Sequence, residues 1–293
     1  MMYDDLKSLL EFNRERLHSL AVSRQQHLDG WLEQLKREEE VAAQLFYTHL
    51  LGKSSDQLPG FTRNLIHQAD FSGDLVLAKK APDGRIFCLL ADATGHGLSA
   101  ALTLMPAASL FRSLVEQGTN LSQLVETINQ ELNQHLPGDR FIAAILVELD
   151  LAERQVQVWN GGLPPLFLLD HQGQFLQQVV SHNLALGILS EQEMEPLIAH
   201  LELPLRGQLF AATDGLMEVR NKFGEMFAHN HLQDCLLQAA GKPPFDTLLQ
   251  ELQHFTGLHS SELEDDLSIM HLSLEHLYQG QDFQPASTVK EVL

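Results

Sequence analysis

Residues Asp70–Gly97 read DFSGDLVLAKKAPDGRIFCLLADATGHG, and this stretch decides the fold. Two apolar runs, Leu75–Lys79 and Arg85–Ala91, flank the four residues Ala81-Pro82-Asp83-Gly84, a combination typical of a β-turn. Strands joined by so short a connection must be antiparallel, because parallel neighbours need a crossover of about a dozen residues or more. The stretch therefore predicts a β-hairpin.

The same arrangement of strand, short polar turn and strand recurs further along the chain. The paired runs are Phe141–Leu149 with Gln155–Trp159 and Leu166–Leu169 with Gln174–Leu176, and single strands are predicted at Gln208–Ala212 and Leu267–Leu274. Helical patterns follow Gly97 and a cap near Asn120, and two more occupy His231–Ala240 and Phe245–Thr256. Pro106 lies inside the first helix and is expected to kink it or end it early. Hairpins and helices in separate blocks predict a layered α+β fold.

The first fifty residues differ in composition from the rest. From Asp4 to Leu50 there is no proline and one glycine, Gly30. A 3-4 spacing of apolar side chains, interrupted by Glu38, predicts one long helix; its members are Leu28, Trp31, Leu35, Ala42 and Leu45. Two interpretations stay open, a coiled coil that forms a homodimer and a helix packed on its own domain. We expect a helical linker over residues 1–52, a folded domain over 60–278 and a flexible tail over 280–293.

Charge and composition exclude several classes of protein. The chain has 19 basic and 39 acidic residues and a net charge of −20, so it has no electrostatic reason to bind nucleic acid or an anionic membrane. No apolar run reaches the ~18–20 residues of a membrane helix, and the N-terminus lacks a signal-peptide pattern, so we expect a cytoplasmic protein. Cys88 and Cys235 lie far apart in the sequence and are predicted to be buried thiols.

Four short motifs place an aspartate beside glycine or another acid at the edge of a predicted strand. They are Ser72-Gly73-Asp74, Asp92-Ala93-Thr94-Gly95-His96-Gly97, Thr213-Asp214-Gly215 and Glu264-Asp265-Asp266. Carboxylates brought together from distant strand ends are how a fold assembles a site for a hard cation, and oxygen ligands suit Mg²⁺ or Mn²⁺. Taken one at a time, each motif also fits a surface turn, a solvated acidic pair or a helix-start loop.

The order of these motifs makes the chain resemble the SpoIIE-like branch of the PPM (type 2C) metal-dependent protein phosphatases. The resemblance covers the chain from about Asp70 to Leu274 and rests on FSGDLVLA, LLADATGHGLSAALTLMP, DRFIAAILVELD, NGGLPPLFLL, LALGIL, FAATDGLMEVRN and EDDLSIMHLSL. It implies an α-β-β-α sandwich of two mainly antiparallel sheets flanked by helices, preceded here by the long N-terminal helix. The form of the first motifs resembles the phosphatase modules of bacterial response regulators, so a receiver domain missing from this chain is one expectation.

The resemblance also implies a catalytic centre of two ions, Mn²⁺ or Mg²⁺, whose ligands are Asp74, Asp92, the backbone carbonyl of Ala93, Asp214, Asp265 and Asp266. Asp92 is implied to bridge both ions, and Asp266 to be a supporting or alternative ligand. Water activated by the ions would be the nucleophile, since neither cysteine precedes an anion-binding loop. His96 has two open interpretations, a proton donor to the leaving oxygen or a loop residue that caps the following helix.

One departure from the family pattern is Asn160-Gly161-Gly162-Leu163-Pro164-Pro165, where relatives commonly have Gly-His-Pro-Pro. Leu163 removes that histidine and leaves the implied metal ligands intact. The implied function is hydrolysis of phosphoserine or phosphothreonine, with a phosphorylated STAS-domain anti-sigma-factor antagonist as the implied substrate in bacterial signalling. Two alternatives stay open, a pseudophosphatase that binds a regulatory partner and a hydrolase of a small phosphorylated signal. Retention of all four aspartates favours an active enzyme.

Overall fold

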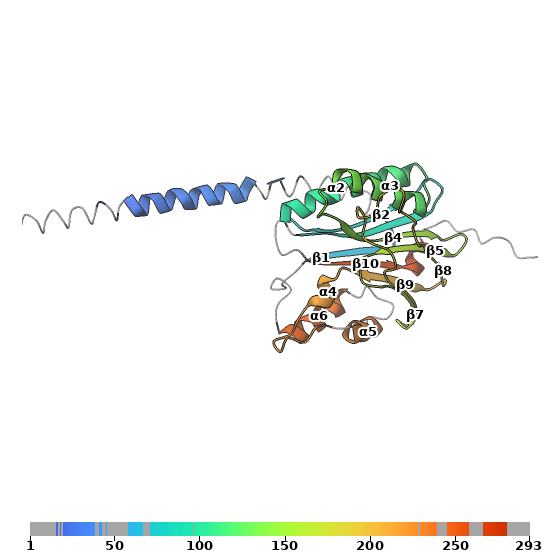
Figure 1. The fold of residues 1–293 in the computed structure, drawn as a ribbon. Helices are drawn as coiled ribbons and strands as arrows, with labels where there is room; N and C mark the ends of the chain where they lie inside the picture. The colour runs from blue at the N-terminus through green and yellow to red at the C-terminus, as the bar shows by residue number, and fades with distance from the viewer. Residues whose placement is uncertain are drawn as a thin grey trace, which may run out of the picture. The chain divides into compact units, whose positions relative to one another are not determined.

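The computed structural model describes residues 16, 18, 20–38, 41, 42, 45, 58–66, 71–95, 97–227, 229–238, 245–257 and 266–279 (Figure 1). The chain divides into two compact units, Met1–Thr48 and His49–Leu293, and each is described by itself. In the first unit residues 20–38 form a continuous helix, which confirms the predicted long helix. Trp31 and Leu35 of its apolar stripe are exposed to 71% and 53%. Its role in a dimer stays a prediction.

The second unit is built on two antiparallel sheets of five strands each. Sheet B has the order β2-β3-β4-β5-β8, with bounds Asp74–Lys80, Ile86–Ala93, Ile142–Asp150, Gln155–Gly161 and Ala199–Glu202. Sheet A has the order β1-β10-β9-β6-β7, with bounds Phe61–Ile66, Leu267–Ser273, Gly207–Ala212, Leu166–Asp170 and Phe175–Val179. The three predicted hairpins are β2–β3, β4–β5 and β6–β7, whereas β1 and β8 have no counterpart among the predicted strands.

The β2–β3 hairpin closes through the turn that the sequence predicts. The backbone N–H of Ala81 donates to the carbonyl of Arg85 at 2.8 Å, and that of Gly84 donates to Ala81 at 3.0 Å. Gly84 has a φ of 96°, a left-handed conformation that glycine adopts without steric cost. In the resulting register Asp74 lies directly opposite Asp92. The hairpin therefore places two of the predicted ligands on neighbouring strands.

Helices cover the outer face of each sheet, which confirms the α-β-β-α sandwich (Figure 1). Sheet B is covered by α2 (Gly97–Glu116) and α3 (Leu121–His135), while α4 (Gly215–Glu218), α5 (His229–Gln238) and α6 (Phe245–Thr256) lie on sheet A, and α7 (Leu274–Gln279) follows β10. One apolar core fills the space between the sheets and includes Val76, Leu90, Ile145, Leu209 and Met270. A second core joins sheet A to its helices and includes Phe210, Phe227, Leu232 and Leu248.

The expectation that Pro106 ends the first helix early is wrong. Helix α2 continues for 20 residues, with Pro106 inside it. Proline in a helix interior costs about 3 kcal/mol or more, because it removes a hydrogen bond and crowds the preceding turn. The residues beyond it include Ala107, Phe111 and Val115, all buried. Burying a single phenylalanine side chain contributes about 1.5–3 kcal/mol, so apolar packing outweighs the cost of the proline.

Helix α2 has the length and apolar composition of a membrane span, and it is the one such helix in the described part of the chain. Its buried residues pack on β2 and β3, which accounts for that composition as the inner face of a core helix. Cys88 and Cys235 are buried free thiols, as the sequence predicts.

Candidate metal centre

Five of the six predicted ligands line one cavity of about 370 Å³, four of them through an aspartate side chain and Ala93 as the predicted backbone ligand. Asp74 begins β2 and Asp92 lies near the end of β3, so both belong to sheet B. Asp214 directly follows Thr213 at the end of β9, and Asp266 directly precedes β10, so both stand at one edge of sheet A. The aspartate motifs, far apart in the sequence, thus meet where the two sheets face each other.

Asp74 is the most enclosed of these carboxylates, with 4% of its surface exposed. Its Oδ2 accepts a hydrogen bond from Thr213 Oγ1 at 2.9 Å, which links the two sheets. Burial raises the pKa of Asp74 to about 7; hydrogen bonds from Ser268 and Thr213 oppose this shift, and the negative charges of Asp266 and Asp214 add to it. A buried carboxylate beside two others is a group whose charge a bound cation stabilises strongly.

The loop after β3 is held by hydrogen bonds on both sides. The N–H of Ala93 donates to the carbonyl of Gly73 at 2.8 Å, and a Cβ atom on Gly73 would lie 3.1 Å from the carbonyl oxygen of Ala93. The N–H of Thr94 donates to Phe141 at 3.1 Å, and Arg140 Nη1 donates to the carbonyl of Thr94 at 2.6 Å. These bonds fix the position of the Ala93 carbonyl, the predicted backbone ligand.

Sheet A contributes its two carboxylates in different ways. Asp266 Oδ2 accepts a hydrogen bond from the N–H of Gly73 at 3.3 Å, which ties the start of β10 to the start of β2. Asp214 is exposed and precedes α4, where its backbone carbonyl accepts from Met217 at 2.7 Å. Its side chain makes no capping hydrogen bond to that helix. The Asp214 carboxylate is therefore not occupied as a helix cap.

The donor set matches a hard divalent cation. Carboxylates and backbone groups line the cavity, and no lysine, arginine or histidine is among its described lining residues. Oxygen donors of this kind are what Mg²⁺ and Mn²⁺ prefer. Within the described ranges, no three His, Cys, Asp or Glu side chains converge closely enough to hold an ion. Asp265 and His96 lie outside the described residues, so the roles predicted for them stay predictions.

Residues 82–275 match the model of the family described as Stage II sporulation protein E (SpoIIE). The chain belongs to the SpoIIE family. RsbP of Bacillus subtilis (strain 168), named a phosphoserine phosphatase, is 26% identical over 198 residues, which are 65% of this chain and 47% of RsbP. RsbU of the same organism, also named a phosphoserine phosphatase, is 25% identical over 279 residues, which are 91% of this chain and 79% of RsbU. This chain therefore spans about half the length of RsbP.

Among solved structures, the SiaA-PP2C domain of Pseudomonas aeruginosa superposes with a TM-score of 0.70. Its sequence identity is 19%, and the match covers 83% of this chain and 98% of that domain. At this identity the likeness shows a shared fold. By family and by fold, the second unit is a SpoIIE-like PPM phosphatase domain, as the motifs predict.

Leu163, where this SpoIIE-family chain departs from the family pattern, packs in the apolar core. Leu163 is 3% exposed and packs between the two sheets, so its side chain takes no part in the metal cavity. Asn160 holds the turn: its Oδ1 accepts from the N–H of Leu163 at 3.2 Å, and its Nδ2 donates to the carbonyl of Pro164 at 3.1 Å. The cavity is lined at this point by Gly162 instead.

Thr213 and Ser268, to which the sequence analysis gave no role, form hydrogen bonds that hold Asp74 in place. Thr213 and Ser268 are buried and face each other across β9 and β10, with Thr213 N donating to the Ser268 carbonyl at 3.0 Å. The N–H of Ser268 donates to Thr213 Oγ1 at 3.1 Å, which leaves the threonine hydroxyl to donate to Asp74. The signal that could have found them is proximity: Thr213 directly precedes Asp214, and Ser268 lies two residues after Asp266.

Proposed function

We propose that this domain hydrolyses phosphoserine or phosphothreonine in a protein substrate, with two divalent ions, Mn²⁺ or Mg²⁺, held by its aspartates. The observation that carries the proposal is the convergence of Asp74, Asp92, Asp214 and Asp266 on one cavity. Family membership and the names of RsbP and RsbU support the same reaction. When bound, such ions supply an activated water and neutralise charge on the phosphate.

The chain's own residues orient the ligands. Thr213 donates a hydrogen bond to Oδ2 of Asp74 at 2.9 Å, which fixes how this carboxylate is oriented in the cavity. Because the threonine hydroxyl is itself fixed by Ser268, the Asp74 side chain loses little freedom when it binds. A ligand displaced by on the order of 1 Å can cost a hundredfold in rate. Thr213 is thus a positioning residue for Asp74.

The remaining ligand roles follow the family pattern and stay part of the proposal. Asp92 would be shared between the two ions, with the carbonyl of Ala93 as a further ligand. Asp214 and Asp265 would hold the second ion, and Asp266, which accepts from the N–H of Gly73 at 3.3 Å, would be a supporting ligand.

The cavity carries negative charge, so the ions are needed for the binding of a phosphate as well as for its hydrolysis. A phosphate dianion that enters it meets carboxylates and no basic side chain among the described lining residues. Like charges at such distances repel, so phosphate can bind only after cations have reversed the local charge. We therefore propose strict metal dependence. By its resemblance to SpoIIE-like phosphatases, the substrate we propose is a phosphorylated STAS-domain anti-sigma-factor antagonist.

Hydrolysis of a phosphoserine protein with Mn²⁺, with Mg²⁺ and with neither ion tests the proposal. Asp92→Asn removes the bridging ligand and is expected to abolish turnover. Asp139→Asn is the matched control, because it removes an exposed carboxylate near the same loop. Turnover that persists in Asp92→Asn at saturating Mn²⁺ would refute the metal assignment.

A catalytically weak adaptor is the second candidate. It is favoured by one observation, the lack of three closely converging ligands in the described part of the chain. The same experiment separates the two functions. Binding of the phosphorylated protein by the wild-type chain, without release of phosphate under any metal condition, would establish the adaptor and exclude the enzyme.

We also propose that the N-terminal helix makes a homodimer. The apolar stripe of this helix, including Leu28, Trp31 and Leu35, is exposed in the single chain, and burying it against a second copy would remove apolar surface from water. Trp31→Glu with Leu35→Glu should convert a dimer to a monomer in a mass measurement in solution. Gln26→Glu with Lys36→Glu, on the polar side of the helix, is the control. Equal mass for both double variants would show that the stripe is not the contact.

A further inference from the structure

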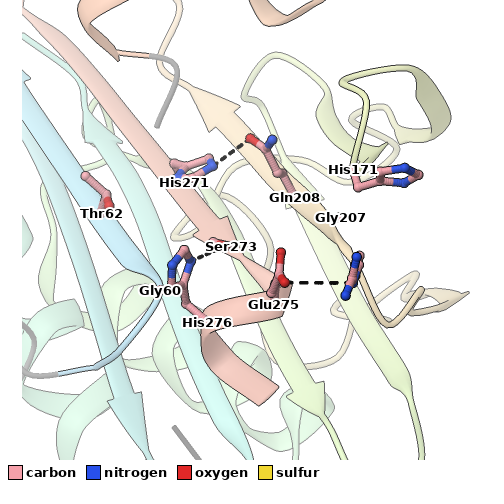
Figure 2. A pocket seen from close by; sticks show the side chains of 10 residues that line it. Gly60, Thr62, His171, Gly207, Gln208, His271, Ser273, Glu275 and His276 are labelled. Atoms are coloured by element: carbon pink, nitrogen blue, oxygen red, sulfur yellow. Dashed lines mark hydrogen bonds and ion pairs between the residues drawn. The ribbon is translucent and has the colours of Figure 1, made fainter. Parts of the chain in front are cut away.

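A second cavity, of about 380 Å³, lies at the opposite end of β9 and β10 from the metal centre (Figure 2). Gln208 lines it from the start of β9, and His271 and Ser273 line it from the end of β10. Asp214 lies six positions after Gln208 along β9 and the residues that follow it, so roughly 20 Å of extended chain lies between the two cavities. The second cavity shares no lining residue with the metal centre.

The floor of this cavity is polar although it is buried. Gln208 is 6% exposed and His271 is 2% exposed. His271 Nε2 lies 2.8 Å from Gln208 Oε1, as the dashed line in Figure 2 shows. Burial, with a smaller contribution from His276, lowers the pKa of His271 to about 4, so the ring is neutral at pH 7. Its single proton then lies on Nε2 and is donated to the glutamine oxygen.

One buried polar atom on this floor is left without a protein partner. His271 Nδ1 is buried and makes no hydrogen bond within the described part of the chain. Because the ring proton lies on Nε2, this Nδ1 is an acceptor. Buried polar groups in native proteins are almost always paired with protein, water or ligand. The floor is therefore built for a polar occupant.

The rim adds a cation and further donors. The Arg206 side chain is 68% exposed, and its Nε lies 3.8 Å from Glu275 Oε1, a distance that leaves the rest of the guanidinium free to bind. Ser273 Oγ lies 2.7 Å from His276 Nδ1, and Thr62 contributes a hydroxyl from β1 (Figure 2). The rim thus combines one cation, one carboxylate and two hydroxyls in a chain whose overall charge is −20.

We propose that this cavity is a second ligand site, which binds a small molecule through a carboxylate or phosphate oxyanion. Arg206 and the amide of Gln208 bind the oxyanion, and the hydroxyls of Ser273 and Thr62 add hydrogen bonds. Its volume is in the range of small-molecule pockets, about 300–1,000 Å³. The site does not depend on the phosphatase reaction.

The experiment uses the full chain, stripped of metal and then dialysed free of chelator, so that the acidic cavity repels anions. Inorganic phosphate and malonate are titrated separately, by calorimetry and by NMR of the histidine rings. We expect one saturable site for at least one probe, with resonance shifts at His271 and His276. The two probes distinguish a phosphate ligand from a carboxylate ligand.

Arg206→Gln is expected to weaken this binding at least about tenfold, since hydrogen bonds to a charged partner are the strong ones. Lys222→Gln removes another exposed cation, one that does not line this cavity, and is expected to leave the affinity unchanged. Three results would each overturn the proposal: no saturable binding of either probe, equal affinity in Arg206→Gln and wild type, or resonance shifts confined to residues away from His271 and His276. Thermal melting of both variants shows that they fold.

Discussion

The two ends of β9 and β10 hold cavities of similar volume, about 370 Å³ and about 380 Å³, and of opposite chemistry. At one end the strands lead to Asp214 and Asp266, and the described lining contains no basic side chain. At the other end the same strands present Gln208 and His271, with Arg206 at the rim.

The difference shows how one pair of strands can serve two unrelated sites. β9 is buried throughout, β10 is buried up to Leu272, and both strands pack into both apolar cores, so apolar side chains separate the two cavities. Burial shifts the pKa of the buried ionisable group at each end in opposite directions. It raises the pKa of Asp74 and lowers the pKa of His271, and in both cases it favours the neutral form. Changes at one end should therefore leave the other end's ligand untouched.

The largest effect is expected from Asp74→Asn. Loss of this ligand should reduce the phosphatase rate on the order of a thousandfold or more, about 4 kcal/mol in activation free energy. The metal-free variant should nevertheless be more stable than the metal-free wild type at pH 8. Because the folded pKa of Asp74 is raised from 3.8 to about 7, its stabilising contribution is present below pH 3.8 and is lost as the pH rises through 7. A neutral amide avoids that loss.

Chemical denaturation at pH 8 and rate measurements on the same preparation check both halves of this prediction. Asp139→Asn is the control for each and should match the wild type. An Asp74→Asn protein that is inactive but also less stable than the metal-free wild type would mean that Asp74 has a structural role.

The next effect in size is stabilisation by metal. An ion that binds only the folded chain adds about 2.7 kcal/mol at a hundred times its Kd. For a domain of this size that corresponds to a rise in Tm of roughly 5–10 °C. Mn²⁺ should raise the Tm of the wild type and not that of Asp92→Asn. An equal rise in both would locate the ion elsewhere, so the acidic end would no longer be the metal site.

The acidic end was predictable from the sequence because its residues come in local motifs. Gly73 next to Asp74 and Thr213 before Asp214 are contiguous, and each motif adjoins an apolar strand that periodicity identifies. The pairing of β2 with β3, which sets Asp74 opposite Asp92, follows from the short turn between them, whereas the pairing of β9 with β10 does not follow from any short turn. The donor-rich end has no such motif, since Thr62, Gln208 and His271 come from three strands that meet only in the folded sheet.

The errors in the predicted fold have the same origin. Strand β1 was not predicted because the strand character of Phe61–Ile66 is visible only once it pairs with β10. Pro106 was expected to disrupt α2 because local propensity takes no account of the burial of Phe111 and Val115 against sheet B. Sequence reasoning succeeded where the cause is local and failed where the cause is a tertiary contact.

An intermediate effect is expected from Thr213→Val. Groups that orient metal ligands typically contribute 10- to 100-fold to metal affinity or activity. Valine keeps the volume of threonine and removes the hydroxyl that donates to Asp74 Oδ2. The concentration of Mn²⁺ that gives half-maximal rate should rise, and Thr213→Ser should restore it. A purely structural role would lower the Tm of both variants without changing the Mn²⁺ dependence.

The smallest effect concerns the pH dependence of stability at the donor-rich end. His271 titrates at about 4 in the folded chain, well below the 6.5 of an unfolded histidine, mainly because it is buried. Its stabilising contribution is therefore complete above pH 6.5 and is lost as the pH falls from 6.5 toward 4, where the unfolded chain takes up a proton that the folded chain does not. One such proton changes the free energy of unfolding by at most about 1.4 kcal/mol per pH unit.

Denaturation of the wild type, His271→Asn and His182→Asn between pH 7 and pH 4.5 isolates this contribution. The groups that line the cavity with His271 and also titrate or carry charge are His171, His276, Glu275 and Arg206, and all four are kept in every variant. The loss of stability on acidification should be shallower in His271→Asn than in the wild type, whatever the change in absolute stability, while the exposed His182 serves as the control. Parallel curves for all three proteins would mean that His271 is charged in the folded chain. Its Nδ1 would then be a donor with a partner in solution, and the oxyanion site would gain a second cation beside Arg206.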